Sequence, residues 1–281
     1  MLRSKLRMVA GAMGAFLASA GTALALPLPW QMGFQPAVTP VMQRIEEFHT
    51  FVLYIITAIS LFVLLLLIWI ILRYNRRANP VPSKVSHNTF LEIIWTGVPV
   101  IILVVIAIPS FKLLYYEADL PPADVTIKAI GKQWFWTYQY TSNGNFQFDS
   151  LGLTQPDTDK SAAAGEPRLL GVDNPLVVPV NKVVEIVPTG ADVIHSWAVP
   201  QFGVKMDAVP GRLNHTWFKA TQTGTFYGQC SELCGANHAF MPIEVKVVSE
   251  ADFDNWVSAA KKKFGTADAS PTATHLAALS K

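Results

Sequence analysis

The stretch FVLYIITAISLFVLLLLIWIIL, residues Phe51–Leu72, contains no charged side chain. An α-helix needs ~20 mostly apolar residues to cross the hydrocarbon core of a bilayer, and this stretch reaches that length. A second uncharged stretch, Ile93–Phe111, follows after a short interruption. Two buried helices of a soluble protein are the alternative, but they would need apolar cover on all of their faces. The sequence therefore predicts two transmembrane helices, at about residues 51–72 and 93–111.

Basic side chains and prolines fill the loop between the two spans. They are Arg73, Arg76, Arg77 and Lys84, with Pro80 and Pro82 among them. Short loops rich in Lys and Arg stay on the cytoplasmic side of a membrane. We therefore expect residues 49–115 to form a helical hairpin with a cytoplasmic loop. Residues 26–48 then form an N-terminal segment on the outer face, and the C-terminal part also faces outward.

Residues 1–25 have the pattern of a secretory signal. Arg3, Lys5 and Arg7 precede the apolar run Met8–Ala20, and Ala23-Leu-Ala25 offers a cleavage site. A third, weak transmembrane span is the alternative, but the run is short for a span and is broken by glycines. We predict a signal peptide over residues 1–25 and an exported mature N-terminus.

Charge is distributed unevenly along the 281 residues. Only 15% of them are charged and 51% are hydrophobic, which is typical of a membrane protein. Residues 113–281 contain 13 Lys and Arg against 17 Asp and Glu, a net charge of −4, although the whole chain is +2. An acidic exported domain favours a basic partner. Nothing in the sequence indicates nucleic-acid binding.

Short segments with β-branched or alternating residues follow the second span. They are Val125–Ile130, Trp134–Tyr140, Leu176–Val178, Lys182–Val187, Trp217–Ala220, Thr225–Tyr227 and Ile243–Val248. Short strands separated by Gly, Pro, Asn and Asp are typical of a β-sandwich. We predict an all-β sandwich domain over residues 116–250, with a surface excursion at Leu151–Glu166. Residues 251–281 are predicted to form a helix at Asp252–Phe264 and a flexible tail.

Cys230, Cys234, His238 and Met241 bring four atoms with metal affinity into one short segment. Thiolate, imidazole and thioether form the ligand set of copper electron-transfer sites, and His195 can approach from a neighbouring loop. A disulfide is the alternative for the cysteines of an exported domain. A bridge over so short a loop would stabilise little and would leave the His and Met unexplained. A mononuclear copper electron-transfer site uses one cysteine with two histidines and a weak methionine. The second cysteine exceeds that set, and two thiolates can instead bridge two copper ions.

Four longer segments extend this pattern: Gln133–Tyr140, Gly190–Pro200, Asp207–Arg212 and Gly228–Pro242. They closely resemble the cytochrome c oxidase subunit II family of haem–copper oxidases, in its bacterial, copper-A type, and the resemblance runs from about residue 48 to 248. It implies a cupredoxin-like domain with a copper-A centre of two copper ions. The ligands that it implies are the side chains of His195, Cys230, Cys234, His238 and Met241 and the carbonyl of Glu232.

The resemblance also implies a function and partners. Electrons from cytochrome c would enter through Trp134, reach the copper pair one at a time and leave for a haem in subunit I, which supports oxygen reduction and proton pumping. Trp136 would share a strand face with Trp134 and serve packing. The Glu232 carboxylate would help bind a magnesium ion shared with subunit I. Glu92 would lie at the mouth of a proton pathway, where a carboxylate at the membrane edge is a reasonable proton handle.

Asp149, Asp173 and Asp192 match positions at which the family meets the lysine-rich rim of cytochrome c. Ala191 stands where some relatives have an acidic residue, so this docking patch is expected to contain fewer acidic side chains. The implied location is the bacterial inner membrane, crossed twice, with the C-terminal domain on the periplasmic side.

Two other kinds of protein share part of this pattern. A membrane-tethered, thioredoxin-like copper-delivery protein also pairs Cys-x3-Cys with a distant histidine, but it would predict alternating helices and strands and usually one span. A quinol-oxidase homologue shares the fold but lacks the copper ligands. The two spans and the complete ligand set favour the cytochrome c oxidase subunit.

Overall fold

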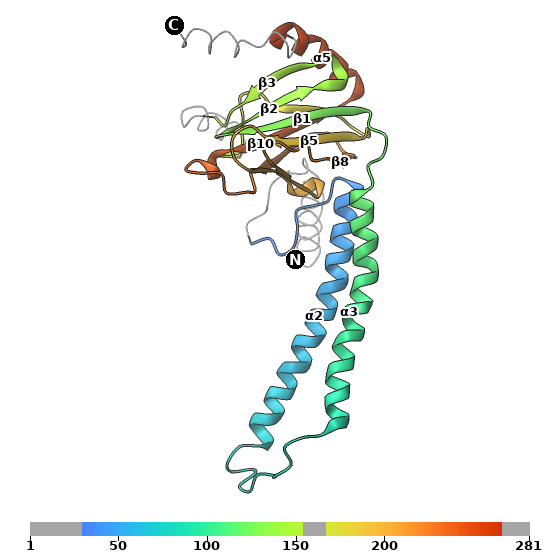
Figure 1. Ribbon diagram of the computed structural model, residues 1–281, viewed down its shortest axis with the longest axis vertical. Helices are drawn as coiled ribbons and strands as arrows, with labels where there is room; N and C mark the ends of the chain where they lie inside the picture. The colour runs from blue at the N-terminus through green and yellow to red at the C-terminus, as the bar shows by residue number, and fades with distance from the viewer. Residues whose placement is uncertain (1–29, 154–166, 266–281) are drawn as a thin grey trace, which may run out of the picture.

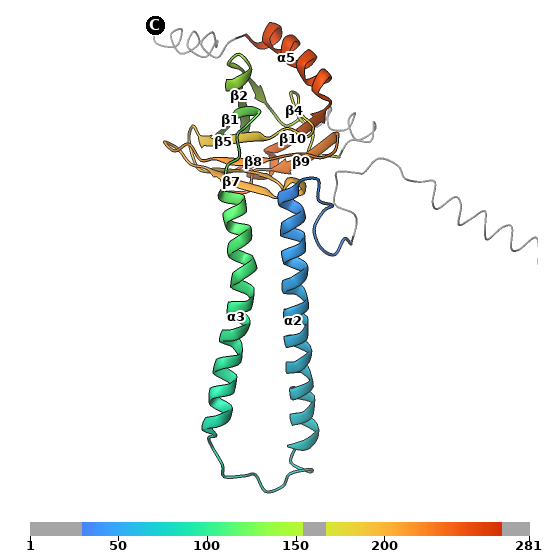
Figure 2. The same cartoon turned by 90° about the vertical axis from the view of Figure 1, so that its right-hand side faces the viewer.

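The computed structural model describes residues 30–153 and 167–265. Two long helices stand side by side beneath a β-domain, and a shorter helix lies against the far end of that domain (Figures 1 and 2). The fold class predicted from the sequence, a two-helix hairpin followed by a cupredoxin-like β-sandwich domain, is confirmed. The predicted signal peptide, most of the predicted excursion and the predicted tail lie outside the described residues.

Helix α2 spans Pro40–Arg73 and helix α3 spans Thr89–Ala118, so both extend beyond the uncharged stretches of the sequence. Thr39 and Asn88 are the N-caps, and each accepts a backbone hydrogen bond through its side-chain oxygen. The most apolar windows of α2 and α3 have mean hydropathies of 3.1 and 2.6, and no part of either window is buried within the chain. Helices that are apolar all round and uncovered are typical of membrane spans.

Ten strands form three sheets within the described ranges. The strands are β1 (Val125–Lys132), β2 (Phe135–Tyr140), β3 (Phe146–Ser150), β4 (Leu176–Pro179), β5 (Val184–Gly190), β6 (His195–Val199), β7 (Val204–Ala208), β8 (Thr216–Phe218), β9 (Gly224–Gln229) and β10 (Pro242–Val248). The sheet orders are β3-β2-β1-β5-β8, β4-β10-β9 and β6-β7. The pairs β1–β5 and β4–β10 are parallel, and the other pairs are antiparallel.

Three of these strands, β3, β6 and β7, are not among the strands predicted from the sequence. Every residue of β6 is buried, so this strand lacks the alternation of buried and exposed residues on which the prediction relied. Strand β6 also contacts β9, so its first residue, His195, lies near the end of β9.

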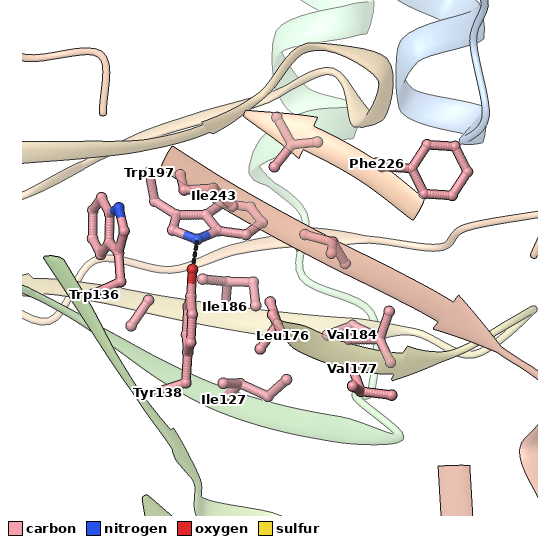
Figure 3. Packing of buried hydrophobic residues seen from close by; sticks show 14 of the residues in the cluster. Ile127, Trp136, Tyr138, Leu176, Val177, Val184, Ile186, Trp197, Phe226 and Ile243 are labelled. Atoms are coloured by element: carbon pink, nitrogen blue, oxygen red, sulfur yellow. Dashed lines mark hydrogen bonds between the residues drawn. The ribbon is translucent and has the colours of Figure 1, made fainter. Parts of the chain in front are cut away.

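The core lies between the sheets and draws on both larger ones. Ile127 and Ile186 from the five-stranded sheet and Ile243 from the three-stranded sheet belong to one buried cluster (Figure 3). Trp197 in β6 is also fully buried, and its Nε1 donates a hydrogen bond of 3.3 Å to the hydroxyl of Tyr138. Burying one large apolar side chain contributes about 1.5–3 kcal/mol, so this cluster supports the strands that carry the site.

A set of hydrogen bonds, called the clasp below, joins the start of α2 to the β-domain. The Thr39 hydroxyl donates to the carbonyl of Phe202 over 2.7 Å, and the backbone N–H of Thr221 donates to the carbonyl of Val38 over 2.9 Å. Phe202 ends the 3-10 turn η2, Pro200–Phe202, which directly follows β6. The clasp, made of Val38, Thr39, Phe202 and Thr221, therefore joins the membrane hairpin to the strand that begins with a candidate ligand.

Helix α5 spans Glu250–Phe264 and begins slightly before the predicted residue 252. Its N-cap is Ser249, whose hydroxyl oxygen accepts from the backbone N–H of Asp252. Trp256 packs against the ring of Tyr140, with the centroids 5.1 Å apart. Trp256 also contacts Phe146 and Phe148 of β3. The helix lies at the end of the five-stranded sheet that is far from the membrane hairpin (Figure 1).

Candidate metal centre

The predicted ligands gather around the loop between β9 and β10, which projects from one side of the β-domain (Figure 1). At the base of this loop the N–H of Cys230 donates to the carbonyl of Met241 over 3.0 Å. The N–H of Ser231 donates to the carbonyl of Ser196 in β6, also over 3.0 Å. The first bond closes the base of the loop, and the second joins the loop to β6, whose first residue is His195.

The loop and β6 together build one cluster of soft ligand atoms. The ligand atoms of His195, Cys230 and Cys234 lie within 4.8 Å of one another, and all three residues are buried. Sγ of Cys230 lies 3.9 Å from Nδ1 of His195, and Sγ of Cys234 lies 3.5 Å from Nδ1 of His238. Each thiol therefore has its own imidazole neighbour.

The spacing of the two sulfurs fits a bound metal and excludes a disulfide in this structure. The Sγ atoms of Cys230 and Cys234 are 3.9 Å apart, and both cysteines are free. A disulfide bond would be about 2.05 Å long. An ion about 2.3 Å from each sulfur, a normal metal–thiolate distance, fits between them. Because thiolates and imidazoles suit copper, the residues present fit a copper centre.

The two remaining predicted ligands differ in their surroundings. Met241 is fully buried in the hydrophobic core cluster at the base of the loop. Glu232 is exposed between the cysteines, and its carbonyl oxygen lies 3.4 Å from Sγ of Cys230. The carbonyl of Glu232 is therefore at the cluster, as expected for a backbone ligand.

The second ring nitrogen of His195 contacts a carboxylate. Oδ1 of Asp192 lies 2.8 Å from Nε2 of His195 and also accepts the N–H of Val193, whereas Oδ2 accepts the N–H of Gln133 over 2.7 Å. Metal-binding histidines commonly bond their other nitrogen to a carboxylate, which fixes the tautomer and the ring orientation. In this arrangement Nδ1 of His195 faces the sulfur of Cys230.

The two thiols differ in acidity. Burial opposes ionisation of Cys230, but hydrogen bonds, first from His195, outweigh it and lower the pKa of this thiol below its ordinary value. Burial, followed by the charge of Cys230, raises the pKa of Cys234. For Asp192, burial is likewise outweighed by hydrogen bonds from His195 and two backbone N–H groups, so the pKa is lowered. The thiolate is the metal-binding form of cysteine, and the surroundings of Cys230 favour it in the metal-free chain.

Two tryptophans contact different residues of the cluster. Trp134 lies in the turn between β1 and β2. The prediction that Trp134 and Trp136 share one face of a strand is therefore wrong. The Nε1 of Trp134 donates to the carbonyl of Cys234 over 3.2 Å. Trp136 is fully buried, and its ring meets that of His195 edge-on with centroids 6.0 Å apart. Trp134 is half-buried and approaches the cluster from the surface.

The three aspartates predicted to dock a partner all hold other groups of the same chain. Asp149 accepts from the Thr137 hydroxyl over 2.5 Å, and Asp173 accepts from the N–H of Leu151 over 2.8 Å. The side chains of Asp149 and Asp192 still expose 49% and 35% of their surface, so they can also meet a partner.

Glu92 lies apart from the cluster, in the first turn of α3 at the far end of the hairpin (Figure 1). Its Oε1 accepts from the N–H of Asn88 over 3.3 Å. A carboxylate at this end of a helix also complements the helix dipole.

Two contacts of the cluster were not predicted from the sequence. An aspartate three residues before a candidate histidine ligand is a local signal for the bond between Asp192 and His195. The Gln133 side chain also donates to the carbonyl of Cys234, over 2.7 Å, but these residues are 101 positions apart. No local sequence pattern indicates a contact over that separation.

Comparisons with known proteins agree over both parts of the chain. The model of the cytochrome c oxidase subunit II periplasmic domain matches residues 125–248, and that of the subunit II transmembrane domain matches residues 27–113. The probable cytochrome c oxidase subunit 2 of Rickettsia bellii is 52% identical over 236 residues, which cover 84% of this chain and 86% of that protein. The chain belongs to the cytochrome c oxidase subunit II family.

Two further relatives of this subunit II chain illustrate the range of similarity. Cytochrome c oxidase subunit 2 of Cereibacter sphaeroides is 44% identical over 272 residues, which cover 89% of each chain. The crystal structure of the periplasmic domain of subunit II of cytochrome oxidase from Bradyrhizobium japonicum is 62% identical, and it covers 52% of this chain and 100% of that one with a TM-score of 0.48. The family predicted from the four sequence segments is confirmed by the family models.

Proposed function

We propose that this chain is the electron-accepting subunit of a cytochrome c oxidase and holds a copper-A centre of two copper ions. The observation that carries the proposal is the buried cluster of two free thiols, each with its own imidazole. Such a cluster, in a subunit II chain with two helices long enough to cross a membrane, fits an electron-transfer metal site of an oxidoreductase complex.

The copper ions would be held by the side chains of His195, Cys230, Cys234, His238 and Met241 and by the carbonyl of Glu232. When bound, copper supplies one-electron oxidation and reduction, taking electrons from cytochrome c and passing them to a haem of subunit I. The chain shields four of the six ligand residues from solvent, because both cysteines, His195 and Met241 are buried, whereas His238 is partly exposed and Glu232 is exposed. Removal of solvent and a fixed ligand geometry tune the potential of such sites.

Trp134 is the side chain proposed to receive the electron. Its indole is half-buried and donates a hydrogen bond to the carbonyl of Cys234, so it joins the protein surface to a ligand residue. The exported domain is acidic, and the partly exposed Asp149 and Asp192 lie on it, together with Asp173. Such a surface would attract the lysine-rich rim of cytochrome c, and the main effect would be a faster association of the two proteins.

Two glutamates are proposed to serve the interface with subunit I. The exposed carboxylate of Glu232 would help bind a magnesium ion shared with that subunit. Glu92, at the opposite end of the hairpin, would lie at the mouth of a proton pathway. In this arrangement the hairpin crosses the bacterial inner membrane and the β-domain faces the periplasm, since the basic loop stays in the cytoplasm.

Copper loading of the full chain in detergent tests the proposal. The reduced chain is loaded with copper and freed of excess metal, and copper content and the electron paramagnetic resonance spectrum are measured. Two coppers per chain with one unpaired electron shared by both nuclei are expected. The Cys234→Ser variant should lose this spectrum, whereas Ser231→Ala, which alters an exposed hydroxyl of the same loop, should keep it.

A different result would favour the copper-delivery protein. A single copper with the spectrum of one copper nucleus, released readily to a chelator, would contradict the electron-transfer proposal. The absence of copper binding by the reduced chain would contradict both functions.

A further inference from the structure

We propose that Gln133 is a positioning residue that ties the two halves of the metal centre together. The inference rests on the proposed copper centre and concerns a residue that would not itself bind copper. One half of the site is His195 at the start of β6, and the other is the loop that carries both cysteines. Gln133 forms hydrogen bonds toward both halves through different atoms.

The backbone of Gln133 reaches the histidine half. Its N–H donates to Oδ2 of Asp192 over 2.7 Å, and the other oxygen of this carboxylate lies 2.8 Å from Nε2 of His195. A carboxylate held at both oxygens has little freedom to rotate. The orientation of the imidazole is therefore set partly from the turn between β1 and β2.

The side chain of Gln133 reaches the cysteine half. Its Nε2 donates to the carbonyl of Cys234 over 2.7 Å, and Nε1 of Trp134 donates to the same oxygen over 3.2 Å. A carbonyl oxygen has two lone pairs, so these two donors satisfy it fully. The shorter bond is that of Gln133, so this amide is the closer restraint on the peptide that follows the second thiol.

The packing at Gly235 shows how closely this contact is built. A Cβ at Gly235 would lie 3.0 Å from Nε2 of Gln133 and 3.0 Å from Cζ2 of Trp134, and the residue has φ of +121°. Only glycine adopts this backbone conformation readily. The chain thus turns away directly after Cys234 and leaves room for both donors at its carbonyl.

Loss of the Gln133 amide should therefore loosen the cysteine loop and leave the histidine side in place. The backbone bond to Asp192 survives any side-chain substitution at this position. The Cys234 carbonyl would keep Trp134 as donor, but the nearer donor would be gone. Since Gln133 is also exposed, a role limited to partner docking would change only the reaction with cytochrome c.

The test compares Gln133→Leu and Gln133→Glu in the full chain with wild type. The first removes the amide, and the second keeps its shape but replaces the donor with a carboxylate oxygen that faces the carbonyl. Gln139→Leu is the matched control, because Gln139 lies in β2 and its amide donates to Asn145 over 2.7 Å, outside the metal loop. Hydrogen exchange in the reduced, metal-free chain and copper retention against a chelator are both measured, with the paramagnetic resonance spectrum.

Both Gln133 variants should exchange faster over residues 229–241, shift the copper spectrum and lose copper more readily. Contacts that orient metal ligands are typically worth about 10- to 100-fold in metal affinity. Gln139→Leu should match wild type in all three measurements. Wild-type exchange and spectra in both Gln133 variants would overturn the inference. If wild type shows no two-copper spectrum but the loop still exchanges faster in the variants, the proposed function fails and the positioning role of Gln133 stands.

Discussion

The Asp192 carboxylate and the His195 imidazole meet through a contact of 2.8 Å between Oδ1 and Nε2. The family resemblance predicts that Asp192 docks cytochrome c, whereas the structure places its carboxylate against a candidate metal ligand. The same side chain is 35% exposed, so the two roles are compatible. They differ in what a substitution would change.

The substitution Asp192→Asn tests the contact with His195. The amide keeps the size of the side chain but weakens the bond to the imidazole, so we expect copper affinity to fall by about 10- to 100-fold. Equilibrium competition with a copper chelator measures this change. Asp173→Asn is the control, since Asp173 caps the N–H of Leu151 instead, and it should retain copper normally. Unchanged copper affinity in Asp192→Asn, with an altered salt dependence of the reaction with cytochrome c, would reduce Asp192 to a docking residue.

The unequal thiol acidities predict a pH dependence of the reduced, metal-free chain. An ordinary cysteine has a pKa of about 8.5. Because the pKa of Cys230 is lowered, its thiolate should persist below that pH and disappear only as the pH falls through the folded-state pKa. The ultraviolet absorbance of the thiolate follows this titration. The Cys230→Ser variant should lose the thiolate absorbance that persists below pH ~8.5, and the Cys234→Ser variant should retain it. The reverse pattern would contradict the assignment of the lower pKa to Cys230.

The buried Glu244 predicts a stability effect away from the metal. Its Oε2 accepts the N–H of Val172 over 3.0 Å, and its Oε1 lies 3.4 Å from Nζ of Lys246. Glu244→Leu leaves the buried N–H of Val172 without this acceptor, so the free energy of unfolding of the β-domain should fall by about 1–3 kcal/mol. Urea unfolding, followed by tryptophan fluorescence in detergent, measures the loss.

An exposed glutamate serves as the control for Glu244. Glu250→Ala removes a surface ion pair with Lys182, for which at most about 1 kcal/mol is expected. Equal losses for the two variants would show that burial of Glu244 has no special weight.

The clasp at Thr39 predicts local opening without loss of the metal site. Thr39→Val removes the N-cap bond from the N–H of Met42 and the hydroxyl bond to Phe202, and a lost cap typically costs about 1 kcal/mol. Hydrogen exchange should rise at residues 38–43 and 200–203. Thr57→Val, within the exposed face of α2, should leave both segments unchanged. Protection equal to wild type in Thr39→Val would show that packing alone holds the clasp.

Much of the fold was readable from the sequence because its signals are local. Uncharged stretches of bilayer length predict helices wherever they occur, and the structure contains α2 and α3 over both. The prediction was weaker where burial is two-sided. Strand β6 is buried throughout, and without alternation its five residues were missed although His195 was singled out.

The candidate site divides in the same way. By itself the sequence determined the kind of ligand, because Cys230, Cys234, His238 and Met241 lie close together in one segment whose chemistry is recognisable without coordinates. Tertiary structure alone decided that Trp134 lies in a turn and that Gln133 joins this turn to the cysteine loop, whereas the bond between Asp192 and His195 also has a local signal in the sequence. The geometry of these contacts depends on how β1, β2, β6 and the loop before β10 pack against one another. That packing follows from burial over the whole domain, which no short pattern of residues records.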